Sequence, residues 1–310
     1  MSALPFSESL LAFSGLLLLA LAFHSKKASS SWAAVPGWIL VGTYFFLNTP
    51  HYVELADPVL IIMSAATLPM AIAISIWEAR LIKKGEISES LNWFRGACFW
   101  AGMPYLMVEK IPWLNVLAIW FVAGQTVLFM RWTGAGDIQL GETYVNIEGQ
   151  SIVTWSEWDG NRWFLDTGGA ENAFFTDLQL ADGTPIGISF VLACTALQSM
   201  IVFVGAIVAL QTAPWQRRVR ALLISLPVIH VLNIFRDAGL VWLHTNFIGW
   251  EWLTLSMFDF GHSYAAKVVS LGAMFLMALV LFELLPQLHR HILELMEKLM
   301  PKKKKRKTQY

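Results

Sequence analysis

Long apolar stretches separated by short charged connections dominate this sequence and restrict the folds that it can adopt. A helix that spans a bilayer needs about 20 predominantly apolar residues. Stretches of this kind lie at residues 8–24, 33–50, 58–78, 92–109, 113–132, 187–210, 219–243 and 263–285. Only 14% of the 310 residues are charged and 56% are hydrophobic, whereas about a quarter of residues are charged in soluble domains. The sequence therefore predicts an all-α polytopic membrane protein, a bundle of about seven or eight transmembrane helices.

Basic residues predict how these helices are oriented. Cytoplasmic loops of membrane proteins are enriched in Lys and Arg, and here such residues cluster at 26–27, 80–84, 217–220 and 302–307. A full crossing by every apolar stretch would put some of these clusters on the wrong side of the membrane. We therefore expect about seven crossings. The segment 92–109 is then a re-entrant or interfacial helix, because Arg95, Glu109 and Lys110 are costly inside a bilayer.

The expected organisation follows from these features. Residues 133–186 form the one long polar segment, and "ETYVNIEGQSIVTW" within it alternates polar and apolar residues, which is typical of β-hairpins. The N-terminal stretch lacks a basic region and a small-residue cleavage site, so we interpret it as a retained helix. We expect N-terminal transmembrane helices at 1–132, an extracytoplasmic β-rich loop at 133–186, transmembrane helices that carry the candidate site at 187–285, and a basic cytoplasmic tail at 286–310.

One cysteine stands out in the run "VLACTALQSM". The chain has two cysteines, Cys98 and Cys194, too few for a disulfide framework and without the spacing of a metal site. Cys194 is either a small apolar residue packed between helices or a nucleophile. Thiol chemistry needs the thiolate, and apolar surroundings raise the pKa of a thiol. The nucleophile interpretation therefore requires a cation or a base nearby, whereas Cys98 has no companion motif and is interpreted as structural.

Two such groups are expected at a similar depth to Cys194. Arg236 lies in the apolar helix "VIHVLNIFRDAGLVW", and intramembrane arginines usually face the bundle interior or a wet cavity. The alternatives are an ion pair with Asp237 or a side chain that snorkels to the interface. His262 lies in "FDFGHSYAAKVVSL", where its near-neutral pKa suits a general base; the alternative is a solvated histidine at a helix cap.

The cysteine, the arginine and the histidine lie in the motifs "ACTALQSM", "LPVIHVLNIFRDAG" and "FDFGHSYAAKVVSLGAMF", all within residues 186–285. Together these motifs resemble the exosortase/archaeosortase family of membrane transpeptidases, and their details look most like its archaeosortase A branch. The chain departs from the family pattern at Ala196 and Leu197, where glycine followed by isoleucine or leucine is expected.

The resemblance implies a function and a set of site residues. Cys194 is then the nucleophile, and Arg236 and His262 are the other catalytic residues. Asn233 lies on the same helix face as Arg236 and, with Thr195 and Ser199, would support the site or contact substrate; the alternatives are structural hydrogen bonds to backbone or neighbouring helices. The implied reaction is cleavage of the C-terminal sorting signal of secreted surface proteins through a thioacyl intermediate, followed by transfer to a lipid head-group amine.

The remaining expectations concern cofactors, binding partners and cellular location. We expect no metal and no cofactor, since the acidic residues of 137–182 fit no calcium-loop spacing. The basic tail is expected to contact membrane lipids rather than nucleic acid. The protein is expected in the cytoplasmic membrane, with an extracytoplasmic active site and a cytoplasmic C-terminus. Two other classes stay open: a transporter in which Arg236 binds an anionic solute, and a non-catalytic membrane scaffold.

Overall fold

The computed structural model describes residues 5–25, 28–54, 58–147, 151–165, 173–252 and 255–299. Its helices are α1 (Pro5–His24), α2 (Ala28–Ser31), α3 (Ala34–Leu47), α4 (Thr49–Glu54), α5 (Pro58–Lys84), α6 (Glu89–Lys110), α7 (Pro112–Thr133), α8 (Leu197–Val208), α9 (Trp215–Asn246), α10 (Met257–Phe260), α11 (Ala266–Leu284) and α12 (Pro286–Leu299). The strands are β1 (Ile138–Val145), β2 (Val153–Thr154), β3 (Phe174–Leu180), β4 (Pro185–Val191), β5 (Glu251–Trp252) and β6 (Leu255–Ser256). A 3₁₀ turn, η1 (Leu192–Thr195), and a π turn, η2 (Gly261–Ala265), complete the described elements.

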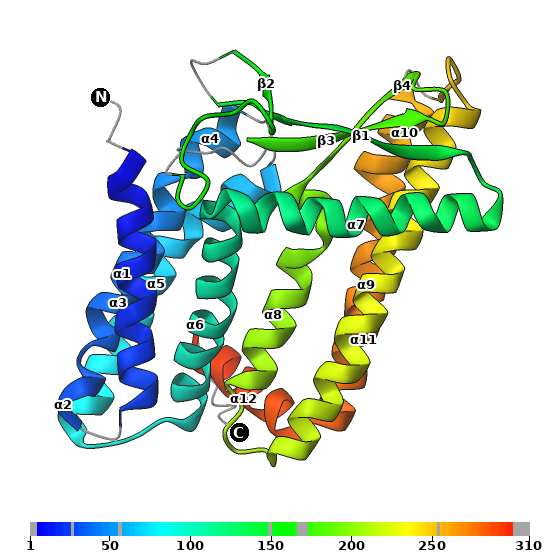
Figure 1. The fold of residues 1–310 in the computed structure, drawn as a ribbon. Coiled ribbons are helices and arrows are strands. Elements are labelled where there is room, and N and C mark those ends of the chain that lie inside the picture. Colours follow the sequence, from blue (N-terminus) through cyan, green and yellow to red (C-terminus); the bar gives the residue numbers. More distant parts are fainter. Residues whose placement is uncertain are drawn as a thin grey trace, which may run out of the picture.

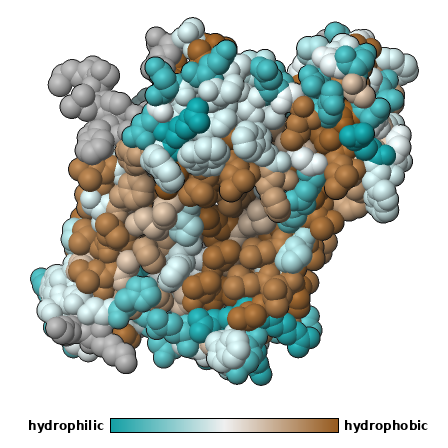
Figure 2. Space-filling view, in the orientation of Figure 1, coloured by the Kyte–Doolittle hydropathy of each residue, from teal (hydrophilic) through white to brown (hydrophobic). Residues whose placement is uncertain are grey.

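A bundle of long helices forms the body of the protein. Helices α1, α3, α5, α6, α8, α9 and α11 run alongside one another, with the sheet at one end and α12 at the other (Figure 1). A hydrophobic band covers the middle of the bundle, and hydrophilic side chains gather at both ends (Figure 2). By length and composition, five described helical segments could cross a membrane: Ser29–Glu54, Pro58–Lys84, Pro112–Thr133, Trp215–Asn246 and Ala266–Leu284. These features define a mostly helical multi-pass membrane protein; the number of crossings stays a prediction.

Helices α6 and α7 run in different directions. The sequence predicts a re-entrant or interfacial helix at 92–109 and a span at 113–132, and which of the two crosses the membrane stays a prediction. Helix α6 is one continuous helix that packs along α1 and α8, whereas α7 lies across the bundle beneath the sheet (Figure 1). The chain turns between them at Ile111, which is extended, and Pro112, which starts α7. Proline fits the first helical turn because its missing N–H has no partner there anyway.

The charged residues of α6 have partners of opposite charge within the protein. Arg95 is buried and pairs with the buried Glu78 of α5, so the charge is neutralised within the bundle. Glu109 and Lys110 sit at the last turn, 3.2 Å apart, next to the sheet-bearing end, where the Lys110 carbonyl accepts a hydrogen bond from the Leu165 N–H. These charges are therefore compatible with a helix that follows the bundle axis.

The β-rich segment is a small antiparallel sheet, as expected. Its strand order is β2-β1-β3-β4, and β3 pairs with both β1 and β4. Apolar side chains from the sheet pack with one face of α7, which includes Ile119, Ala123 and Met130, to form a core separate from that of the main bundle. Cys194 packs against this second core.

The expected boundary after this segment is wrong. The sequence predicts a helix over 187–210, but β4 continues to Val191, η1 follows, and α8 begins only at Leu197. Residues 187–196 of the apolar stretch are strand and turn because β4 completes the sheet by pairing with β3. At the opposite end, α12 occupies much of the expected tail 286–310, and residues 300–310 lie outside the described residues.

Candidate functional site

Cys194 lies in the short turn that joins the sheet to α8. The η1 turn is held by Thr195, whose Oγ1 donates to the Leu192 carbonyl at 2.7 Å and accepts from the Leu197 N–H at 3.3 Å. Cys194 is partly buried, against the core formed by α7 and the sheet. The structure therefore places the cysteine ahead of the first turn of α8, rather than within a membrane-spanning helix.

Ala196 closes this turn in a left-handed conformation. Its φ and ψ are 52° and 13°, and among the described residues it is the one non-glycine residue with positive φ. A side chain in this region of φ and ψ costs about 1–2 kcal/mol, which glycine avoids. The family resemblance predicts glycine at this position. This chain has alanine instead, which places a methyl group where the backbone conformation favours glycine.

Ala196→Gly is expected to stabilise the folded protein, by up to about 1 kcal/mol once the greater freedom of glycine in the unfolded chain is included. The midpoint of thermal unfolding in detergent measures this. Ala206→Gly, in the interior of α8, is the matched control and should instead destabilise by about 1 kcal/mol. An equal loss of stability in both variants would contradict the assignment of strain to Ala196.

Asn233 and Arg236 of α9 both reach the backbone of Cys194. The Asn233 Nδ2 donates to the Cys194 carbonyl oxygen at 2.8 Å, and the Arg236 Nη2 donates to the same oxygen at 3.4 Å. A turn and a helix that lie far apart in sequence are thus joined through one carbonyl. Asn233 therefore makes a structural contact with the Cys194 turn, and the same carbonyl brings the Cys194 backbone and Arg236 together.

Asp237 completes the cluster and was not among the predicted site residues. Its carboxylate accepts from the Asn233 Nδ2 at 2.9 Å and from the Arg236 Nη2 at 2.7 Å. The side chain of Asp237 is 3% exposed, against 26% for Arg236, so the acid is the buried member of the pair. The spacing of Asn233 and Asp237, one helical turn apart, was the signal in the sequence that could have included it.

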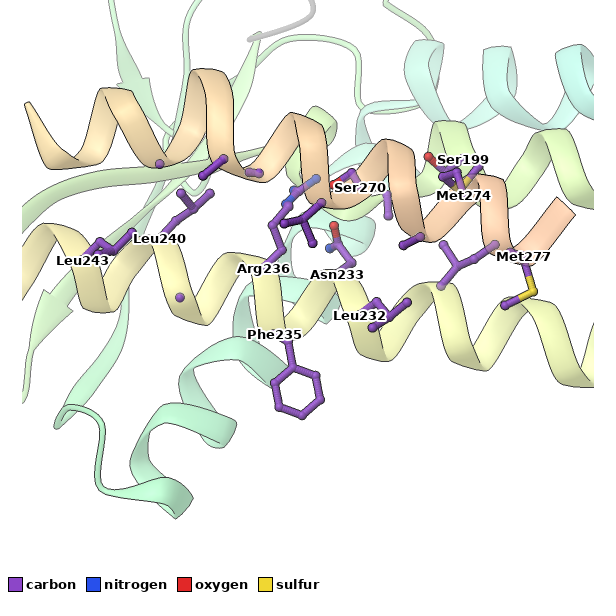
Figure 3. Close-up of a pocket in the computed structure, with 18 of the residues that line it drawn as sticks. Ser199, Leu232, Asn233, Phe235, Arg236, Leu240, Leu243, Ser270, Met274 and Met277 are labelled. Carbon is purple, nitrogen blue, oxygen red and sulfur yellow. The ribbon is translucent and has the colours of Figure 1, made fainter. Parts of the chain in front are cut away.

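A cavity of about 530 Å³ opens beside this cluster. We call it the site cavity. Arg236 and Asn233 project into it from α9 toward α11, and Ser199 faces it from α8 (Figure 3). Phe235 also lines it, with its ring on the opposite side of α9 from Arg236 (Figure 3). Most of its wall is apolar, and Ser270, Met274 and other side chains of α11 form its far side. The arrangement sets one cation and one amide at the edge of an apolar space, where their hydrogen bonds are stronger than in water.

The other predicted site residues occupy distinct positions. His262 lies in η2; its exposed imidazole stacks on the Phe258 ring with centroids 5.7 Å apart, and its neighbour Gly261 lines the site cavity. Ser199 lines the cavity, whereas Thr195 serves the η1 turn. Deeper in α9, the His230 Nε2 lies 3.0 Å from the Gln125 Oε1.

Burial raises the pKa of the Cys194 thiol above its ordinary value. The charge of Asp237 adds to this rise, while a backbone hydrogen bond at Val191 and the positive charge of Arg236 oppose it. The thiol at rest is therefore protonated near neutral pH. Among the described residues, no group of three or more His, Cys, Asp or Glu side chains is arranged to hold a metal ion.

The fold and the site define a multi-pass helical protein in which a cysteine turn is braced by an arginine and an asparagine. No family model matches the sequence, and no solved structure is significantly similar to it. Archaeosortase A of Haloferax volcanii is 27% identical over 200 residues, which are 64% of this chain. The chain spans 58% of the length of that curated relative. This similarity agrees with the family resemblance of the motifs and suggests a relationship at the level of the family.

Proposed function

We propose that the protein is a membrane cysteine transpeptidase of the archaeosortase kind, with Cys194 as the nucleophile and Arg236 and His262 as the other catalytic residues. The observation that carries the proposal is the convergence of Arg236 and Asn233 on the Cys194 turn, at the edge of an apolar cavity. Similarity to archaeosortase A over 200 residues supports the same class of protein.

The proposed reaction starts from the protonated thiol. His262 accepts the thiol proton, and the thiolate sulfur attacks the scissile carbonyl carbon. Arg236 stabilises the negative charge that develops on the carbonyl oxygen, because its charge persists at any working pH. The carbon–nitrogen bond then breaks, the leaving amine takes the proton from His262, and a thioacyl-enzyme remains. Asn233 and Asp237 position Arg236 rather than touch substrate, since both are bonded within the cluster.

The proposed substrate is a secreted surface protein whose C-terminal sorting signal has a short motif, a transmembrane helix and a basic cluster. The apolar wall of the site cavity supports this assignment, because it lies along α9 and α11, two helices long and apolar enough to cross a membrane. Small residues in that wall, among them Gly239, Ala266 and Ala273, let another helix approach closely. In this proposal the site faces the extracytoplasmic side.

A lipid head-group amine is the proposed acceptor. Its nitrogen attacks the thioester carbon, an amide bond forms, and the Cys194 thiol is regenerated. Water in place of the amine gives hydrolysis instead. The mass of the processed protein separates the two, since only transfer adds the mass of a lipid.

The test pairs the protein with a membrane-bound reporter that carries such a C-terminal signal. We expect the native chain to cleave the reporter, and Cys194→Ala to leave it intact at equal membrane abundance, because no other group supplies the nucleophile. Cys98→Ala is the matched control and should retain cleavage. Cleavage by Cys194→Ala, or no cleavage by the native chain of any reporter with this signal, would contradict the proposed function.

The raised pKa of Cys194 predicts a pH dependence for its alkylation. In a Cys98→Ala background without substrate, the rate of reaction with iodoacetamide should rise about tenfold per pH unit and level off above the usual pKa of about 8.5. The sign follows from burial, which favours the neutral thiol. Arg236→Gln should move the plateau to higher pH and Asp237→Asn to lower pH. A plateau near pH 7 in the parent would show that the thiolate is already favoured at rest.

A further inference from the structure

A second cavity, of about 560 Å³, lies on the other side of α8 from the site cavity. Its wall comes from α1, α3, α4, α5, α6 and α8. Whereas Ser199 of α8 and the preceding Ala196 face the site cavity, Gln198, Ile201 and Val202 face this one. The proposed transpeptidase reaction makes no use of it.

The wall of the second cavity changes character along its length. Near the sheet-bearing end it carries polar side chains, among them Ser9 of α1, Asn48 of α3, Tyr105 of α6 and Gln198 of α8. Farther along the same helices the lining is small or apolar: Leu16, Val41, Cys98, Ala101, Gly102, Ile201 and Val202. Helices α1, α3, α6 and α8 all change in the same sense, so the cavity as a whole has one polar end and one apolar end. An amphiphile aligned with the bundle axis matches this gradient.

The length of the cavity matches one leaflet of a bilayer. Along α6 the lining runs from Cys98 to Glu109, which at 1.5 Å per residue is about 16 Å. That is about half of the roughly 30 Å hydrocarbon thickness of a membrane. The wall also reaches the lipid-facing surface, because the lining residues Phe45, Met63 and Val202 are 45%, 62% and 57% exposed. A lipid could therefore enter from the side.

A pair of opposite charges marks the polar end. Glu109 and Lys110 both line the cavity, and their side chains are 19% and 8% exposed. The two side chains pair with each other at 3.2 Å, so they present a positive and a negative charge side by side. An ammonium has three donors and a carboxylate accepts several hydrogen bonds, so a zwitterionic head group can lie against the pair with its phosphate beside Lys110 and its ammonium beside Glu109. An anionic head group without an amine complements only the lysine.

We propose that the second cavity binds one membrane phospholipid with a zwitterionic, amine-bearing head group, its acyl chain lying along α6 and α8 and its head group at Glu109 and Lys110. The site is separate from the Cys194 cluster and stands whether or not the proposed transpeptidase function is correct.

The test uses phosphatidylcholine vesicles that contain a phosphatidylethanolamine probe with a photoactivatable group in its acyl chain. We expect cross-links on the lining segments of α6 and α8, located by peptide mass spectrometry. Val202→Trp fills the cavity from an exposed position and should reduce these cross-links at least tenfold. Leu223→Trp, at another exposed apolar position, 69% exposed on α9, is the matched control and should leave them unchanged.

A second experiment tests which head group the cavity prefers. Glu109→Gln should abolish the preference for the ethanolamine probe over a phosphatidylglycerol probe, while acyl-chain cross-links to α8 persist. Labelling spread evenly over the outer helix surfaces, or labelling that Val202→Trp does not change, would overturn the proposal, as would a protein helix recovered in the cavity. Lipid cross-linking is also measured in the Cys194→Ala variant, which should lose cleavage but keep the cross-links. A failure of the lipid proposal is therefore distinguishable from a failure of the proposed transpeptidase function.

Discussion

Arg236→Gln is expected to reduce reporter cleavage by about 10²–10³-fold, the usual cost of removing one donor that stabilises a developing oxyanion. The reason is geometric: the Arg236 guanidinium lies at the Cys194 turn and projects into the site cavity (Figure 3). Arg236→Lys should recover little activity, because an ammonium lacks the planar fork that reaches two acceptors at once. Cleavage rates at saturating reporter, normalised to membrane abundance, measure the effect.

A structural explanation for the same loss must be separated from a catalytic one. Removal of Arg236 leaves the buried Asp237 carboxylate without its ion-pair partner, which by itself destabilises a protein. The double variant Arg236→Gln, Asp237→Asn removes both charges and should restore thermal stability close to that of the parent. It should still fail to cleave. Recovery of cleavage in the double variant would make Arg236 a structural residue.

Arg95→Met is expected to destabilise the folded protein by about 3–5 kcal/mol, the cost of leaving a buried charge unpaired. Arg95 and Glu78 form an ion pair with side chains only 8% and 2% exposed, and the Trp38 Nε1 donates to the same carboxylate at 3.4 Å. Arg95 also donates to the Ala22 carbonyl at 3.4 Å. The pair therefore joins α1, α3, α5 and α6. Unfolding in detergent with a denaturant series measures the change.

The matched controls use the same helices. Arg80→Met removes an exposed cation of α5 and should change stability by less than about 0.5 kcal/mol. The double variant Glu78→Gln, Arg95→Met removes both buried charges and should regain most of the loss, because neutral or apolar replacements of a buried pair are often tolerated. A single variant as stable as the parent would mean that Glu78 is not charged in the bundle.

The candidate site was predictable in its residue types but not in its connections. The expected cysteine, arginine and asparagine lie together, because the "ACT" turn and the "NIFR" helix are placed side by side by the bundle. The role of Asp237 as the shared acceptor needed the structure, since an Arg–Asp neighbour in a sequence is equally consistent with a surface pair. The catalytic roles of Cys194, Arg236 and His262 stay predictions.

The sequence by itself determined the class of the protein. Apolar stretches of membrane-spanning length, few charges and a polar segment with strand-like alternation were enough for a helical membrane protein with a small sheet, because these are properties of composition and period within a single segment.

The tertiary structure alone decided that α6 follows the bundle axis while α7 lies across it. It also decided that the chain pairs as β4 before α8 begins. Hydropathy measures how apolar a helix is, whereas its direction depends on what each face packs against. Helix α7 buries Ile119 and Ala123 against the sheet, and Arg95 of α6 is neutralised by a residue of another helix.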